Sequence, residues 1–86
     1  MNTVHLIDFG EAPAKPVCEV QVGDVLLYNY GTAAVVLKVE RKGAMFGFHV
    51  RSLTHNDKGR EYPPSRFRRA NTLQPVSNHD EAWWLR

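Results

Sequence analysis

The chain has 86 residues, of which 43% are hydrophobic, and a formal net charge of +2 at neutral pH. A chain of this length forms one domain, and a domain this small buries only about 60% of the surface that its unfolded chain exposes, which leaves little room for a substrate cavity. The longest aliphatic run, residues 33–37, is far shorter than the roughly 20 residues of a membrane span, and the first residues lack the pattern of a signal peptide. We therefore expect a cytoplasmic protein that does not associate with membranes.

Cysteine and histidine usage argues against metal chemistry. Cys18 is the only cysteine, so one chain can form neither an internal disulfide nor a zinc site built from thiolates. The alternating residues around Cys18 predict a small buried side chain and not a reactive thiol. The four histidines lack the spacing that places two ligands on one helix face. We expect no metal and no other cofactor.

The first quarter of the chain is predicted to mix strands with a loop. Residues 4–9 are predicted to form a short strand. Residues 10–16 are predicted to be a loop, because the two prolines in this segment cannot donate hydrogen bonds to a ladder. Residues 17–22 alternate between apolar and polar side chains and predict another strand, which ends at a turn formed by Gly23 and Asp24.

Three strands are predicted from the strongest patterns, at residues 25–30, 33–41 and 45–53. A tight hairpin at residues 42–44 should join the second of them to the third. Because successive side chains of a strand point to opposite faces, we expect Val35, Leu37 and Val39 to share one face. Leu37 and Phe48 are predicted to lie in the core.

The remaining elements are a turn at residues 56–59, a helical turn at 65–69, a closing strand at 71–76 and a short helical tail at 77–86. Leu73 is expected to anchor the closing strand. Asn78 is expected to cap the helix of the tail, since Glu81 follows it three residues later.

Short strands at intervals of 8–12 residues indicate an all-β barrel or sandwich. The segments Val22-Gly23-Asp24-Val25 and Tyr62-Pro63-Pro64-Ser65-Arg66-Phe67 resemble small barrels of the Src-homology-3-like type and the related Kyrpides-Ouzounis-Woese-like modules. This resemblance implies a small five-stranded barrel with a short helical turn before its last strand and a short C-terminal helical tail. We expect a single domain over residues 1–86, with the barrel core at 17–76 and the tail at 77–86.

Basic residues are concentrated in the middle of the chain, where residues 38–69 carry nine lysines and arginines against three acidic residues. Arginine pairs with phosphate through two hydrogen bonds, and aromatic rings stack on bases. This pattern predicts a non-enzymatic module that presents a basic edge to nucleic acid or to a nucleic-acid-associated protein. The candidate contact residues are Arg51, Lys58, Arg60, Arg66, Arg68 and Arg69. The alternative is that Phe67 faces the core while the neighbouring arginines only solubilise a helical turn.

Aromatic residues supply four further candidates for partner binding. Tyr28 and Tyr30 share one strand face, and they form either an exposed aromatic strip or part of the core. Trp83 and Trp84 end the chain, and they either plug an open end of the barrel or anchor a partner or a second copy of the chain. The tail could therefore support a homo-oligomer.

No catalytic motif of a known type is present, so we expect no enzymatic activity. Two alternatives to nucleic-acid binding are considered. One is a protein-binding adaptor or inhibitor, of the kind that phages and mobile elements encode. The other is an oligomeric small-barrel enzyme: the chain resembles type II dihydrofolate reductases in length and in its Gly23-Asp24-Val25 segment, and some ribonuclease toxins also begin a barrel with Gly-Asp-Val. The pore segment of the reductases has no counterpart before Pro75.

Overall fold

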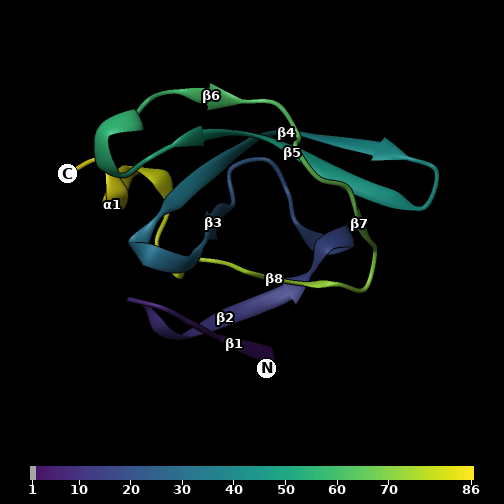
Figure 1. The fold of residues 1–86 in the computed structure, drawn as a ribbon, viewed down its shortest axis with the longest axis horizontal. Coiled ribbons are helices and arrows are strands. Elements are labelled where there is room, and N and C mark those ends of the chain that lie inside the picture. The colour runs from purple at the N-terminus through teal and green to yellow at the C-terminus, as the bar shows by residue number, and fades with distance from the viewer. Residues whose placement is uncertain (1) are drawn as a thin grey trace.

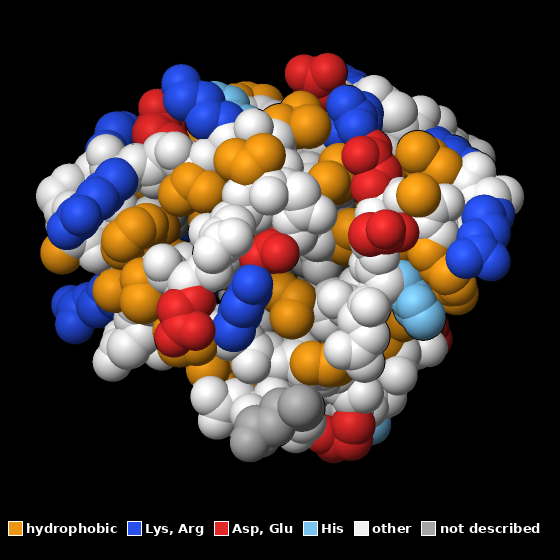
Figure 2. Space-filling view, turned by 180° about the vertical axis from the view of Figure 1, so that it is seen from behind, with side chains coloured by type: hydrophobic (Ala, Val, Ile, Leu, Met, Phe, Trp, Pro, Cys, Tyr) orange, Lys and Arg blue, Asp and Glu red, His pale blue; other side chains and the backbone are white. Residues whose placement is uncertain are grey.

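The computed structural model describes residues 2–86, which form two antiparallel sheets (Figure 1). The smaller sheet has the order β1-β2-β8, with strands β1 (Asn2–Leu6), β2 (Gly10–Pro16) and β8 (Leu73–Pro75). The larger sheet has the order β3-β4-β5-β6, with β7 also paired to β5; its strands are β3 (Val25–Leu27), β4 (Ala33–Lys42), β5 (Met45–Ser52), β6 (Glu61–Tyr62) and β7 (Arg68–Arg69). The short helical elements are η1 (Val17–Glu19), η2 (Asn29–Gly31), η3 (His55–Asp57) and α1 (Glu81–Trp84). Seen from behind, the surface mixes basic, acidic and apolar side chains (Figure 2).

The all-β prediction is confirmed, but the sheets do not close into a five-stranded barrel. The main cause is the segment predicted as a loop, which is the central strand β2 of a separate sheet. Pro13 is tolerated there because its carbonyl accepts a hydrogen bond from the Val76 amide (2.8 Å), so the missing N–H costs only one bond of the ladder. β2 therefore pairs with β1 and β8 in a separate sheet and does not complete a barrel with the larger sheet.

The first strand of the larger sheet is shorter than predicted. β3 ends at Leu27, and the chain then turns through η2, where Tyr30 and Gly31 adopt left-handed backbone angles (φ 66° and 75°). The Asn29 side chain accepts a hydrogen bond from the Ile7 amide (3.0 Å), which ties this turn to the end of β1. The residues that form these bonds show no periodic pattern in the sequence. The apolar and aromatic pattern alone therefore predicts a strand that continues to residue 30.

The β4–β5 hairpin agrees with the prediction in position but not in the facing of β4. The two strands pair from Ala34–Ser52 to Lys42–Met45, and a bulge between Val36 and Lys38 shifts the register. A bulge inserts one unpaired residue and reverses the facing of the residues beyond it. As a result Val35 and Leu37 pack in one cluster, whereas Val39 packs with Val36 in another, so the predicted common face is wrong.

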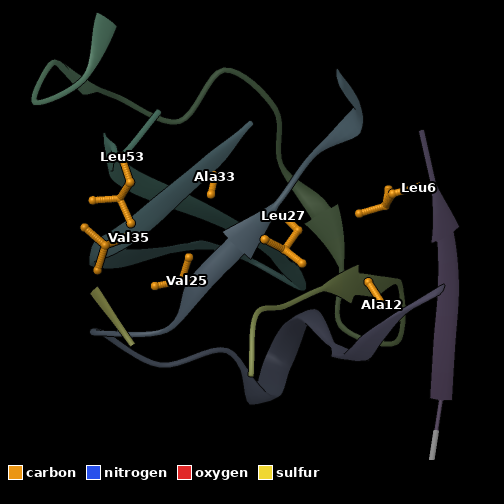
Figure 3. Close-up of a cluster of buried hydrophobic side chains, with 7 residues drawn as sticks. All are labelled: Leu6, Ala12, Val25, Leu27, Ala33, Val35 and Leu53. Carbon is orange, nitrogen blue, oxygen red and sulfur yellow. The ribbon is translucent and has the colours of Figure 1, made fainter. Parts of the chain in front are cut away.

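Two hydrophobic clusters form the core. The first lies between the two sheets and comprises Leu6, Ala12, Val25, Leu27, Ala33, Val35 and Leu53 (Figure 3). The second comprises Val20, Leu26 and Val36, with Phe48 and Val50 among the half-buried side chains packed against it. β3 contributes to both clusters, because alternate residues of the strand point to opposite faces. Leu37 and Phe48, the predicted core residues, are half-buried at the borders of the first and second cluster.

The segment predicted as a strand before Gly23 forms the helical turn η1, and Cys18 is exposed there instead of buried. This turn pairs with the loop before β8, because the amides of Val17 and Cys18 donate to the carbonyls of Thr72 and Ala70 (2.8 and 3.1 Å). The alternating pattern is thus overridden by a long-range pairing.

The predicted helical turn at residues 65–69 is also wrong. The segment is extended and ends in β7, where Arg68 pairs with Phe46. Pairing of Arg68 and Arg69 with β5 holds the end of this segment in an extended conformation. In β8, Gln74 is buried while Leu73, the predicted anchor, is 38% exposed.

The C-terminal tail docks on its own chain, where Glu81 of α1 pairs with Arg51 of β5. Trp84 packs against the first cluster, meets Phe9 edge to face (6.0 Å between ring centroids) and donates its indole N–H to Ser77 (3.1 Å). Asp80, not Asn78, caps the helix by accepting from the Trp83 amide (3.0 Å). Trp83 remains 40% exposed, stacked on His79.

This difference between the two tryptophans predicts unequal effects on stability. Trp84→Ala is expected to lower the free energy of unfolding by about 2 kcal/mol, because it removes a large, half-buried ring and its hydrogen bond. Trp83→Ala should cost less than about 1 kcal/mol. Urea unfolding of both variants measures the difference, and the Trp84 effect should not depend on protein concentration. Equal effects, or an effect that vanishes on dilution, would show that the tail does not dock within one chain.

Candidate functional site

A cavity of about 480 Å³ opens on one face of β5, beneath the chain that joins β6 to β7. We call it the aromatic cavity, because four of the side chains that line it are Tyr28, Phe46, Phe48 and Tyr62. Its polar and charged lining residues include Asp57, Arg66, Arg68 and Gln74. A concave apolar site with a few convergent polar groups is typical of ligand-binding sites.

The cavity exists because of how residues 63–67 cross the edge of β5. Tyr62 pairs with one end of β5 and Arg68 with the other, so the segment between them arches past the middle of the strand. Gly47 makes this arch possible: a Cβ atom at Gly47 would lie 2.8 Å from the Phe67 ring and 2.9 Å from Pro64. The ring of Phe67 is also covered by the Lys42 ammonium group, 4.8 Å from its centroid. The arch is therefore fixed by packing against a residue that has no side chain.

Arg68 is held in a defined orientation by a buried amide. Its guanidinium group donates to Oε1 of Gln74 (3.1 Å), whose side chain is almost fully buried. The amide nitrogen of Gln74 donates in turn to the carbonyl of Pro75 (3.0 Å), which fixes which way the amide faces. Burial raises the pKa of the Tyr28 hydroxyl, and the nearby charge of Arg68 offsets part of this rise. The cavity thus presents a neutral hydroxyl beside an oriented guanidinium group.

Asp57 is held in a comparable way at the other polar part of the lining. Its two oxygens lie 2.7 Å from the Tyr62 hydroxyl and 3.0 Å from the Ser52 hydroxyl. The hydrogen bond from Tyr62, followed by that from Ser52, lowers the pKa of Asp57, and the same bond raises the pKa of Tyr62. The carboxylate of Asp57 is therefore ionised at neutral pH and acts only as an acceptor.

The lowered pKa of Asp57 predicts a pH-dependent contribution to stability. The carboxylate stabilises the fold above its unfolded pKa of 3.8, and this contribution is lost as the pH falls through the lower folded pKa. Asp57→Asn keeps the shape of the side chain but removes the charge. Thermal unfolding from about pH 7 to about pH 2 should show a difference in Tm between the two proteins that shrinks below the unfolded pKa. A difference that stays constant over this range would contradict the prediction.

The structure brings several of the predicted basic residues to this site. Arg66 and Arg68 line the cavity, and the Arg60 guanidinium lies over the Tyr62 ring (5.3 Å to its centroid). Lys58 and Arg69 are exposed on the turn and strand on either side. In Figure 2, basic side chains recur along the left margin, the side of the molecule that carries the β4–β5 hairpin.

Arg51 does not belong to this group. Its neighbours in β5, Val50 and Ser52, line the cavity, so Arg51 points to the opposite face of the strand. There its guanidinium group forms an ion pair and hydrogen bond with Glu81 of α1. Arg51 thus fastens the tail to the sheet.

The four aromatic candidates lie in different environments. Tyr28 is half-buried and lines the cavity, whereas Tyr30 is 68% exposed on η2. The prediction that they share one strand face is wrong, because β3 ends at Leu27. Trp84 docks on the core and Trp83 remains on the surface beside a smaller hollow of about 260 Å³. Asp57 and Gln74 were not among the sequence candidates. The one available signal was Gln74, a polar residue at the centre of the predicted closing strand.

Among residues 2–86, no group of three or more histidine, cysteine, aspartate or glutamate side chains is placed to hold a metal ion. No helix within the same residues is long and apolar enough to cross a membrane. Comparison of the chain with protein-family models, with curated proteins and with solved structures finds no match. The site's own geometry is therefore the basis for assigning a function.

Proposed function

We propose that this protein is a non-enzymatic binding module for single-stranded nucleic acid. The observation that carries the proposal is the combination of an aromatic cavity with two arginines in its lining, Arg66 and Arg68. Proteins that bind single strands combine a basic surface, which follows the phosphates, with aromatic side chains on which bases stack. A base can enter a concave site only when it is unstacked, which favours a single strand over a duplex. A cytoplasmic setting fits a ligand of this kind.

The charge around the cavity supports an anionic ligand. Arg60, Arg66 and Arg69 carry no ion pair among those found in residues 2–86, so their charges are available to phosphates. The one acidic residue in the lining, Asp57, has both oxygens engaged by hydroxyl groups. Arginine contacts phosphate through two parallel hydrogen bonds, which gives orientation as well as attraction.

The experiment is a fluorescence-anisotropy titration with labelled RNA and DNA of about ten nucleotides, as single strands and as duplexes, at ~50 mM salt. The expected result is binding of single strands at least about tenfold tighter than duplexes, weakening steeply with salt. Absence of binding to every nucleic acid would reject the proposal and favour a protein-binding adaptor or inhibitor. Tighter binding of duplexes would show that the basic edge acts without the cavity.

A further inference from the structure

The polar groups of the aromatic cavity make opposite demands on a ligand. Arg68 can only donate hydrogen bonds, and the ionised Asp57 can only accept them. Both are pre-oriented, Arg68 by the buried Gln74 and Asp57 by Ser52 and Tyr62. Pre-oriented groups of this kind discriminate between ligands, because a ligand that fails to pair with them leaves a desolvated polar group without a partner.

We infer that the aromatic cavity selects guanine, with Arg68 on the O6 and N7 acceptors and Asp57 on the N1 and N2 donors. This inference rests on the proposed function and specifies the base that the cavity takes. Paired donation from arginine to O6 and N7 is the commonest specific contact of proteins with guanine. Gln74 occupies one terminal nitrogen of Arg68, and the other N–H groups remain for the ligand.

Asp57 has the acceptor capacity that the other edge of guanine requires. A carboxylate offers about four lone-pair positions, and the two hydroxyl groups use two of them. The N1–H and N2–H groups of guanine are adjacent donors that match the remaining positions. The rings of Phe46, Phe48 and Tyr62 supply stacking surface, which accepts any base and adds no discrimination.

The other bases leave one of the two residues badly paired. Adenine places its N6 amino donor beside N7, so a donor would face the donors of Arg68. Uracil has a single N–H between two carbonyl oxygens, which would face the negative charge of Asp57. Cytosine offers its N4 amino group to Asp57 but lacks the paired O6 and N7 acceptors. Guanine alone matches both residues.

The test compares single-stranded RNA of about nine nucleotides that carries guanine, adenine, cytosine or uracil at the centre of an otherwise all-uracil strand. We expect guanine to bind about 10–100-fold more tightly than the others, the range that one good bidentate contact gives. Replacing the guanine by inosine, which lacks the N2 amino group, or by 7-deazaguanine, which lacks N7, should each weaken binding about tenfold. These ligand changes require no protein variant and so do not depend on its folding.

Variants of the protein test which residue contacts which edge of guanine. Asp57→Asn is expected to abolish the difference between guanine and inosine, and Arg68→Lys the difference between guanine and 7-deazaguanine. Equal binding of all four bases would overturn the inference and leave the proposed function standing. Failure of every strand to bind would overturn the proposed function and this inference together. Loss of both differences in each variant, with folding intact, would show that the two residues do not read separate edges.

Discussion

Replacing Arg66, Arg68 and Arg69 together by alanine is expected to weaken binding of a single strand by about 100-fold at low salt and to flatten its salt dependence by about 1.4 units, because Arg66 and Arg69 contact phosphates whereas Arg68 contacts the base. Each arginine that neutralises a phosphate releases condensed counterions, which contributes about 0.7 to the slope of log K against log salt for a single strand. The measurement is the same anisotropy titration at salt concentrations from ~50 to ~200 mM. An unchanged slope would show that Arg66 and Arg69 do not contact phosphates.

Two further variants make this result specific. Arg51→Gln removes one positive charge from the opposite face of β5, where the side chain pairs with Glu81, and should leave the slope unchanged. Arg66→Ala with Arg69→Ala spares Arg68 and its bond to Gln74, so it separates loss of binding from local rearrangement. Thermal unfolding of each variant confirms that the fold is retained. If Arg51→Gln changed the slope as much per charge removed as the substitutions at the cavity do, binding would depend on net charge and not on the cavity.

Leu26→Ala is expected to lower the free energy of unfolding by about 3 kcal/mol, the largest effect on stability that we predict for a single substitution. Leu26 is fully buried, belongs to the second cluster and forms a bridge with Val76, so it joins the two sheets. For a domain of this size such a loss corresponds to a fall in Tm of about 15 °C. Val22→Ala removes atoms from a side chain that is 65% exposed and should change stability by less than about 0.5 kcal/mol.

Similar effects of Leu26→Ala and Val22→Ala in urea unfolding would contradict the packing of the second cluster. Because this cluster lies under Phe48 and Val50, Leu26→Ala should also weaken ligand binding by loosening the lining of the cavity. The Val22 variant should bind as the unaltered protein does.

The β4–β5 hairpin could be predicted from the sequence because its signals are local. An alternating apolar run, a short turn with Gly43 and a second alternating run determine it without help from distant residues. β2 could not be predicted in this way. Its prolines indicate a loop, and the segment becomes a strand only because β1 and β8, the latter some 60 residues further along, pair with its two edges. Propensity gives way to long-range pairing at such positions.

The candidate site also combines features that local sequence predicts with features that depend on distant residues. Arg66 and Arg68 were predicted from a local concentration of charge, and both line the cavity. The groups that orient the polar lining come from distant positions, Gln74 from β8 and Ser52 from the end of β5. Nothing in the sequence around Gly47 indicates that the absence of a side chain there leaves space for Phe67. The charge of the site is thus local information, whereas its shape depends on tertiary structure.

The central claim is that the aromatic cavity is the binding site for a single strand, and backbone amide chemical shifts of the isotope-labelled protein test it most directly. Titration with the strand that carries one central guanine should shift the amides of residues that line the cavity, among them Phe48, Asp57 and Arg68. The amides of β1 and of the exposed Trp83 should not move. Shifts confined to β1 or to the C-terminal tail, with those of the cavity unchanged, would contradict the account.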